Sequence, residues 1–474
     1  MKKLIILLLL AMASAAPAQS KMRFRGAKTY ACRFYLRDKQ NCGYSIDRPS
    51  HFLSAKSIER RKKQKLKIDS TDLPVSPVYV EQFRVKGVDV LGTSRWNNTV
   101  LACSRDTALL NRLAQLSCVS ECRMVYESPD SIDGAVKPFR PNVHNDFNRW
   151  DSLRGDPLGM ARTQMEMIGG DRLHEVDLRG RGITIAVLDG GFLNADLLPA
   201  LAKTHVEGIR NFAVMGGDQM ADFKDERQAL FESIDHGTKV LSALAADAPE
   251  VLSGTAPEAS YWLLRCEDPH TEMPIEEDYW AMAAEFADSV GADVLNSSLG
   301  YYEYDKPFSS YRLQDLDGHT ALISRTASLL AGKGMVLCNS AGNSGMSWWK
   351  KITVPADATN ILTVGAVNNH RQNAPFASVG PSQDGRVKPD IAALGAPAAL
   401  LSGRGTLVHD MGTSFSTPIV CGLVACLWQG LPHKTALEIM DLVRRSASQA
   451  DEPDNITGYG IPDFWQAYMI GQSQ

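Results

Sequence analysis

Four polar residues stand where predicted strands end or predicted helices begin, and together they could carry out nucleophilic hydrolysis. They are Asp189 after the run ITIAVL, His236 in IDHGTKV, Asn343 after MVLCNSA, and Ser414 in GTSFSTP. A serine hydroxyl becomes a good nucleophile when a histidine removes its proton, and a buried aspartate holds that histidine in the correct tautomer. A side-chain amide and the backbone N–H of the serine can stabilise the oxyanion that forms. The residue types therefore predict acyl transfer by Asp189, His236 and Ser414, with Asn343 as the oxyanion donor.

Each of these signals also has a purely structural explanation. An aspartate or an AGN sequence after a strand is often part of a turn, and HGT often begins a helix. Serine and threonine cap helix starts, and Pro418 is tolerated early in a helix because the first amides lack intrahelical partners. GTSFSTP before an apolar helix is the most specific of the four signals, and their combination at element ends favours catalysis.

These residues need a scaffold, and the pattern after residue 156 predicts one. Short apolar runs alternate with helical stretches; the runs are ITIAVL, SYWLLRC, ADVLNSSL, MVLCNSA and ILTVGAV. Continuous apolar strands are typical of a sheet covered on both faces, and strand–helix alternation is typical of a parallel sheet. We therefore expect a doubly wound α/β domain over residues 156–471, with its site past the carboxyl ends of the strands.

A different pattern covers residues 28–127. Its order of strand, helix, strand, strand, helix and strand predicts a small α+β domain of ferredoxin-like form. The basic run RRKKQK at residues 60–65 is interpreted as a solvated helix face, with a protease-sensitive site as the alternative. Residues 128–155 are polar and rich in proline, asparagine and aspartate, so they are expected to form a linker.

The motifs DGG, HGTKV, NSSLG, NSAGNSG and GTSFSTP occur in this order and resemble those of the subtilisin-like serine peptidases. The resemblance covers about residues 156–470. It implies that Asp189, His236 and Ser414 are the catalytic residues. It also implies that Asn343 binds the oxyanion.

The region before residue 156 resembles the inhibitory propeptide of exported bacterial members of that family. The resemblance rests on FLSAKSIERRKKQ and DLPVSPVYV within residues 28–127. The chain departs from the family at Gly190, where many members have serine or threonine, so one hydrogen bond to the neighbouring carboxylate is absent. It also has Lys239 where histidine is common, and no role follows for this lysine.

The resemblance further implies two backbone walls of a primary specificity pocket. The walls are Ser298, Leu299 and Gly300 on one side and Ser340, Ala341 and Gly342 on the other. Thr353 stands where some relatives have glycine, so it is expected to shorten the pocket. The pocket floor is expected to include Val354 and Pro355, where the family often has a cis proline.

This pocket composition predicts the preferred substrate side chain. None of its positions carries an acid, and burying an unpaired charge is costly, so cleavage after arginine is expected to be poor. Medium apolar residues such as leucine or methionine are expected before the cut. The insertion that contains Trp348 and Trp349 could fold over the entrance.

The N-terminus has the features of a secretory signal peptide. Lys2 and Lys3 precede the apolar residues 4–12, and the small-residue stretch ASAAPA follows. Such a segment is too short to span a membrane as a helix, so residues 1–18 are expected to be removed. The mature protein is expected to be exported to the periplasm or the extracellular space, with no membrane span.

The composition argues against several classes of partner and cofactor. A net charge of -4 over 474 residues provides no basic footprint for nucleic acid. The nine cysteines form no CxxC pair and no HExxH occurs, so a zinc site is poorly supported. The last four cysteines are interpreted as small core residues; they are Cys266, Cys338, Cys421 and Cys426. The resemblance implies no required cofactor, and although calcium is common in the family, no loop has ligands that the sequence identifies.

Together these features predict an exported serine endopeptidase that is made as a precursor and processes itself within the linker. Its expected partners are protein or peptide substrates and its own propeptide, which acts as an intramolecular inhibitor. The alternative from another class is a non-catalytic peptide-binding or chaperone-like relative, which the loss of a triad residue would favour. Acidic sedolisin-type peptidases use a glutamate base and an oxyanion aspartate, and His236 and Asn343 argue against them.

Overall fold

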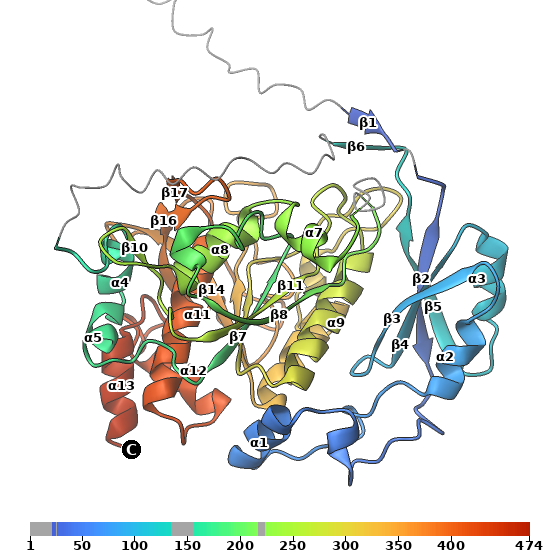
Figure 1. The fold of residues 1–474 in the computed structure, drawn as a ribbon, viewed down its shortest axis with the longest axis horizontal. Coiled ribbons are helices and arrows are strands. Elements are labelled where there is room, and N and C mark those ends of the chain that lie inside the picture. Colours follow the sequence, from blue (N-terminus) through green and yellow to red (C-terminus); the bar gives the residue numbers. More distant parts are fainter. Residues whose placement is uncertain (1–20, 25, 134–154, 217–222) are drawn as a thin grey trace, which may run out of the picture.

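The computed structural model describes residues 21–24, 26–133, 155–216 and 223–474 (Figure 1). The expected signal peptide and most of the expected linker therefore lie outside the described residues. The rest forms two parts, a larger α/β part with a parallel sheet and a smaller part with an antiparallel sheet. The smaller part, residues 26–133, is referred to below as the N-terminal domain.

The larger part is built around a seven-stranded sheet whose neighbouring strands are all parallel. In spatial order the strands are β15 (Ile391–Ala396), β14 (Leu362–Asn368), β13 (Val336–Ser340), β12 (Val294–Ser297), β7 (Thr184–Asp189), β11 (Ser260–Arg265) and β8 (His205–Asn211). The chain fills one side of the sheet from β7 and then the other side from β12. In sheets of this kind, ligands bind beyond the carboxyl ends of the strands where the order reverses, so the ends of β7 and β12 are the expected site.

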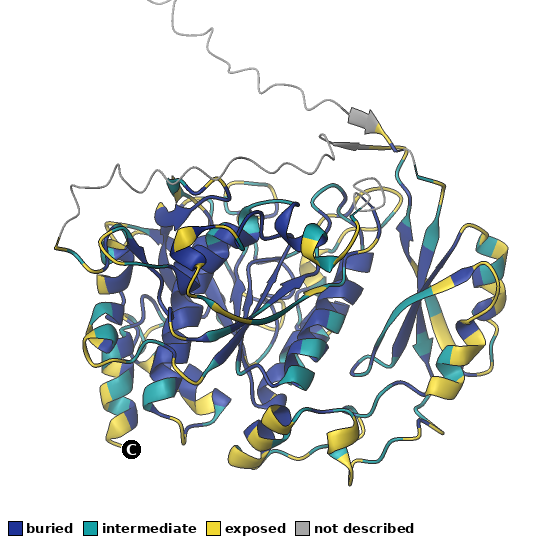
Figure 2. Ribbon diagram, viewed as in Figure 1, coloured by how far each residue is buried: buried dark blue, intermediate teal, exposed yellow. Residues whose placement is uncertain are grey.

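Helices cover both faces of this sheet. One face carries α8 (His236–Ala245) and α11 (Thr413–Gly430), and the other carries α9 (Ile275–Val290) and α10 (Leu322–Leu329). Ile185 and Val187 of β7 pack into the core beside α8 and α11. Ala186 and Leu188 pack into the core beside α9. Figure 2 shows β7 and α11 almost entirely buried, and the predicted doubly wound α/β fold is confirmed.

Shorter elements complete the larger part. They are α4 (Arg162–Glu166), α5 (Gly170–Glu175), α7 (Glu226–Phe231), α12 (Ala436–Arg445), α13 (Phe464–Gln472) and the hairpins β9 (Asp247–Ala248) with β10 (Leu252–Ser253) and β16 (Ala398–Leu401) with β17 (Leu407–Asp410). The four cysteines assigned to the core are fully buried, which confirms that interpretation. None of the nine cysteines, which all lie in described segments, forms a disulfide. Within the described ranges, no helix combines the length and the apolarity needed to cross a bilayer.

The N-terminal domain has the predicted ferredoxin-like order. Its antiparallel sheet runs β3 (Val88–Ser94), β4 (Thr99–Ser104), β2 (Tyr30–Leu36) and β5 (Val119–Glu127), with α2 (Pro77–Phe83) and α3 (Thr107–Leu113) on one face. A short pair, β1 (Lys21–Arg23) and β6 (Ser131–Asp133), adjoins it. The other face of the sheet packs against the larger part. Val100 and Ala102 of β4 join the core under α2 and α3, whereas Leu101 and Cys103 join the core around α9.

The interpretation of residues 60–65 as a solvated face is wrong for two of them. Helix α1 (Ala55–Lys63) lies at the amino ends of the central strands, where Ser54 at its N-cap donates its backbone N–H to the carbonyl of Ser289 at 2.9 Å. Arg60 and Arg61 are buried there, while Lys62 and its C-terminal neighbour remain exposed. A basic run predicts a charged helix. Which face of that helix becomes buried depends on the surface it packs against, which comes from a distant part of the chain.

Candidate active site

Asp189 and His236 form the polar centre at the carboxyl end of β7. Asp189 is the last residue of this strand and is fully buried, and His236 is the first residue of α8. The Nδ1 atom of His236 donates to the two carboxylate oxygens of Asp189 at 2.8 and 3.0 Å. One of these oxygens also accepts the backbone N–H of Gly190 at 2.8 Å. The structure thus brings together two of the residues predicted from the sequence.

The pair has a defined proton-accepting atom. Burial lowers the pKa of His236, but the charge and the hydrogen bond of Asp189 outweigh burial and raise it to about 9. Because Nδ1 is bound to Asp189, Nε2 is the nitrogen left to exchange a proton with another group. The arrangement stabilises an imidazolium and leaves a neutral imidazole able to act as a base at higher pH.

Ser414 reaches the same edge of the sheet from α11. It is the second residue of this helix, and only 7% of its surface is exposed. Its hydroxyl donates to the carbonyl of Ser298 at 3.3 Å instead of to His236. The next residue, Phe415, places its ring centroid 5.7 Å from that of His236, so the first turn of α11 lies directly beside the pair.

Asn343 is held so that its amide nitrogen is available. Its Oδ1 accepts the backbone N–H of Thr413 at 2.9 Å and the hydroxyl of the same residue at 3.0 Å. The residue is exposed, and its Nδ2 lies on the side of Gly412. The backbone N–H of Ser414 is in the first turn of α11, where amides have no intrahelical acceptor. Both groups can therefore donate to a developing oxyanion.

The residues predicted to form the specificity pocket converge on Thr353. A Cβ atom added to Gly300 would lie 2.2 Å from the Thr353 hydroxyl, and one added to Gly342 would lie 3.0 Å from it. The Thr353 backbone N–H donates to the carbonyl of Ala341 at 3.2 Å. Thr353 therefore lies between the two predicted walls, and the following Val354–Pro355 peptide bond is cis.

The other wall residues lie at or near the ends of β12 and β13. The Ser298 hydroxyl donates to the carbonyl of Ser414 at 2.9 Å, which ties this wall to the start of α11. Leu299 directs its side chain into the core around α9. Ser340 is the last residue of β13 and is buried. These contacts fix the backbone and leave little freedom for the walls to move apart.

The two tryptophans of the insertion behave differently. Trp349 is buried and stacks on Tyr302 with centroids 4.8 Å apart. Trp348 is 73% exposed, and its ring meets Tyr302 edge-on at 6.1 Å. Because Tyr302 follows the wall residue Gly300 by two positions, the insertion packs beside the chain segment that continues from this wall, with the ring of Trp348 exposed.

Glu267, which was not among the residues predicted from the sequence, lies beside the polar pair. A Cβ atom added to Gly190 would come within 2.7 Å of Oε2 of Glu267. Burial and the charge of Asp189 raise the pKa of Glu267 to about 7. The signal was present in the sequence, because Glu267 directly follows the predicted strand SYWLLRC, just as Asp189 follows ITIAVL.

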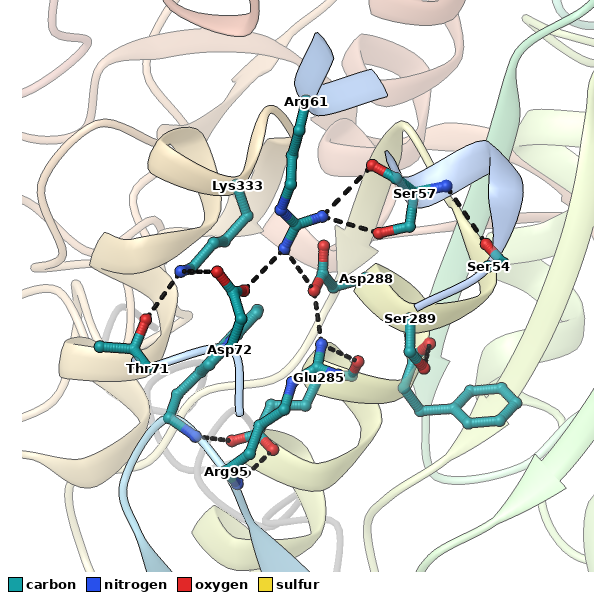
Figure 3. A network of polar contacts seen from close by, with 12 residues as sticks. Ser54, Ser57, Arg61, Thr71, Asp72, Arg95, Glu285, Asp288, Ser289 and Lys333 are labelled. Carbon is teal, nitrogen blue, oxygen red and sulfur yellow. Dashed lines mark hydrogen bonds and ion pairs between the residues drawn. The ribbon is translucent and has the colours of Figure 1, made fainter. Parts of the chain in front are cut away.

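A second set of polar contacts joins the N-terminal domain to α9 (Figure 3). The carboxylate of Asp288 forms ion pairs with Arg60, Arg61 and Arg95, with the Arg61 contact at 2.8 Å. Figure 3 shows the contacts of Arg61 and Arg95 with this carboxylate. Burial raises the pKa of Asp288, but the three guanidiniums outweigh burial and hold it below its usual range. Asp288 itself is fully buried.

Two further carboxylates of α9 take their partners from the N-terminal domain. Glu285 accepts the backbone N–H groups of Arg95 at 2.7 Å and of Trp96 at 3.1 Å. The guanidinium of Arg33 donates to both oxygens of Asp278 at 2.7 Å. This interface lies away from the Asp189–His236 pair and could not be read from local sequence patterns, since each contact joins residues far apart in the chain.

Comparison with known proteins agrees with this architecture. The sequence profile described as the Subtilase family matches residues 180–460, and that described as the Peptidase S8 propeptide domain, Bacteroidota, matches residues 31–137. The chain is 25% identical over 336 residues to an alkaline protease of Alkalihalobacillus alcalophilus, covering 70% of this chain and 76% of that protein. It is 26% identical over 306 residues to subtilisin BL of Lederbergia lenta, covering 64% and 96%. It is also 25% identical over 331 residues to the subtilisin-like protease SBT6.1 of Arabidopsis thaliana, covering 66% of this chain but only 28% of that relative.

Proposed function

The chain belongs to the subtilase family of serine peptidases, and we propose that it is an endopeptidase whose catalytic residues are Asp189, His236 and Ser414. The observation that carries the proposal is the paired Asp189 and His236, with Ser414 in the first turn of the adjacent helix. In this assignment Ser414 is the nucleophile, His236 is the general base, and Asp189 fixes the tautomer and stabilises the imidazolium.

The proposed reaction uses these residues in the following steps. As Oγ of Ser414 attacks the peptide carbonyl carbon, Nε2 of His236 takes the hydroxyl proton. The oxygen of the tetrahedral intermediate receives hydrogen bonds from Nδ2 of Asn343 and the backbone N–H of Ser414. The C–N bond then breaks, the leaving amine takes the proton from His236, and an acyl-enzyme ester remains. Water attacks the ester with the same base, which releases the acid and restores the serine.

The pocket geometry supports a preference for medium apolar residues before the cut. Thr353 occupies the space between Gly300 and Gly342, so a long side chain has little depth to enter. None of the predicted pocket residues is acidic, and an unpaired guanidinium buried there would lose its hydration without gaining a partner. Leucine and methionine are therefore the proposed preferred residues, and arginine is disfavoured.

The chain carries a propeptide domain, which we propose acts as its intramolecular inhibitor. Two features support this role: one face of its sheet shares a core with α9, and three α9 carboxylates take partners from it. The proposed sequence of maturation is export, removal of residues 1–18, and self-cleavage within residues 128–155. The proposed destination is the periplasm or the extracellular space.

A fluorophosphonate serine probe tests the proposal directly. The processed wild-type protein is expected to be labelled at Ser414 and to hydrolyse peptides, and the Ser414→Ala variant is expected to do neither. Labelling at another serine, or hydrolysis by the alanine variant, would contradict the assignment of the nucleophile. A wild-type protein that is not labelled and does not hydrolyse peptides would instead be a non-catalytic peptide-binding relative.

A further inference from the structure

The carboxylate of Glu267 occupies a space that the backbone beside Asp189 leaves empty. Gly190 directly follows Asp189, and a Cβ atom added to it would lie 2.7 Å from Oε2 and 3.6 Å from Cβ of Glu267. The same added atom would lie 3.1 Å from Cδ1 of Ile234, so the space is bounded on that side as well. A side chain at position 190 and the present position of the Glu267 carboxylate exclude one another.

The backbone on the N-terminal side of Glu267 is fixed to the residue pair that it approaches. The backbone N–H of Cys266 donates to the carbonyl of Asp189 at 3.0 Å. The guanidinium of Arg265, which is fully buried, donates through Nε to the carbonyl of Gly190 at 2.8 Å. The backbone that leads into Glu267 is therefore anchored to the turn that follows Asp189.

We propose that Glu267 is a positioning residue of the catalytic site, whose carboxylate packs over Gly190 and supplies a second negative charge that stabilises protonated His236. The proposal rests on the function assigned above to Asp189, His236 and Ser414. It also accounts for the glycine at position 190, since any larger side chain would displace the carboxylate.

The surrounding charges agree with this role. Burial and the negative charges of Asp189 and Asp268 raise the pKa of Glu267 to about 7, against the opposing charges of His236 and Arg265. Glu267 is thus an anion in the alkaline range in which His236 loses its proton.

Two deeper carboxyl groups also face this glutamate. Burial, together with the negative charge of Glu267, raises the pKa of both Glu272 and Glu276 well above the usual range.

A nearby cation has the opposite effect on His236. Lys239, one turn along α8, lowers the pKa of His236. Its ammonium group pairs with Asp410 at 3.0 Å and lies 3.7 Å from Asp235. The pKa of His236 is therefore lowered by burial and by Lys239 and raised by Asp189 and Glu267. Removing Glu267 and removing Lys239 are expected to shift it in opposite directions.

The pH dependence of kcat/KM for a peptide substrate, measured on the processed enzyme, tests the proposal. Glu267→Gln keeps the shape and removes the charge, so the acid limb is expected to move to lower pH by about 0.5–1 unit. Gly190→Ala pushes the carboxylate away and is expected to move the limb in the same direction by less, with no added effect in the Glu267→Gln background. Lys239→Gln is the matched control and is expected to move the limb to higher pH.

The outcomes separate this proposal from the function on which it rests. An acid limb that stays in place in Glu267→Gln overturns the proposal, whether kcat falls or not, because a merely structural glutamate would change the rate without moving the limb. An increase in KM alone, confined to basic substrates, overturns it as well and makes Glu267 a substrate contact. Thermal melting identifies a variant that has not folded, in which case Gly190→Ala decides. A wild-type enzyme that neither hydrolyses peptides nor reacts with the fluorophosphonate overturns the assigned function and this proposal together.

Discussion

Replacing Asp288 by alanine is expected to weaken the docking of the propeptide domain more than any exposed substitution at the same interface. The side chain is fully buried and is the common acceptor of Arg60, Arg61 and Arg95. In the variant, Arg61 keeps Asp72 at 2.9 Å as a partner. The other two guanidiniums lose their carboxylate and are left close together in a buried position.

The magnitude follows from the cost of removing one member of a buried ion pair. Such a removal costs about 3–5 kcal/mol because it leaves the partner charge buried and uncompensated. That cost corresponds to about a 100- to 5,000-fold weaker complex. Lys56→Met is the matched control, since Lys56 pairs with Glu207 at 2.6 Å across the same interface but is 57% exposed. An exposed pair contributes about 1 kcal/mol or less, so about a fivefold change is expected.

The assay uses the full chain with Ser414→Ala, so that no self-cleavage occurs. A recognition sequence for another protease is inserted into residues 134–154, the chain is cut there, and dissociation of the two parts is measured. High salt is expected to reduce the contribution of Lys56 to binding of the propeptide domain. The contribution of Asp288 is expected to stay nearly unchanged, because buried ion pairs are screened less. If the dissociation constant of Asp288→Ala is no larger than that of Lys56→Met, the reasoning that the buried Asp288 cluster stabilises the docked propeptide domain is refuted.

Four further outcomes are expected. Ser414→Ala, expressed as the full chain, is expected to accumulate as uncut precursor on a gel; normal processing would show that another protease matures it. Asn343→Ala is expected to lower kcat by about 100- to 1,000-fold with little change in KM, because one oxyanion donor is lost; a raised KM with normal kcat would assign Asn343 to substrate binding. Thr353→Gly is expected to deepen the pocket, so that cleavage sites in a mixed peptide library shift from leucine and methionine toward phenylalanine and tyrosine; an unchanged preference would show that Thr353 does not limit it. Because the pKa of His236 is raised to about 9, kcat/KM of the wild type is expected to fall as the pH drops below that value, and a flat profile between pH 7 and pH 9 would contradict this.

Local patterns were sufficient to place part of the candidate site. Asp189 ends an apolar strand and His236 begins a helix, and each can be recognised within a few residues. The parallel sheet brings the carboxyl ends of such strands to one edge, so a rule about element ends also predicts which residues meet. Thr353 has no such local signal, and its position between the pocket walls came from the family resemblance alone.

The interface between the N-terminal domain and α9 could not be predicted from the sequence. Arg60 and Arg61 belong to a basic helix run whose composition is typical of a solvated face. Their burial depends on Asp288, which lies on α9 in a different part of the chain. Burial of these two guanidiniums is tolerated because both pair with that carboxylate and because Arg60 also donates to backbone carbonyls. No pattern within residues 60–65 contains this information.

Gly190 and Glu267 show a different limit of sequence comparison. The glycine can be recognised as a departure from the family, and taken alone it indicates one hydrogen bond fewer at Asp189. In the structure the space beside Gly190 holds the carboxylate of Glu267, which lies two residues beyond the end of the neighbouring strand β11, so a charged group stands where those relatives have a hydroxyl. Adjacent parallel strands are joined by long crossovers. A residue at the end of one strand therefore contacts residues that are far away in the sequence. The effect of glycine at position 190 depends on a residue beyond the neighbouring strand, and a single sequence does not show which residues of neighbouring strands lie side by side.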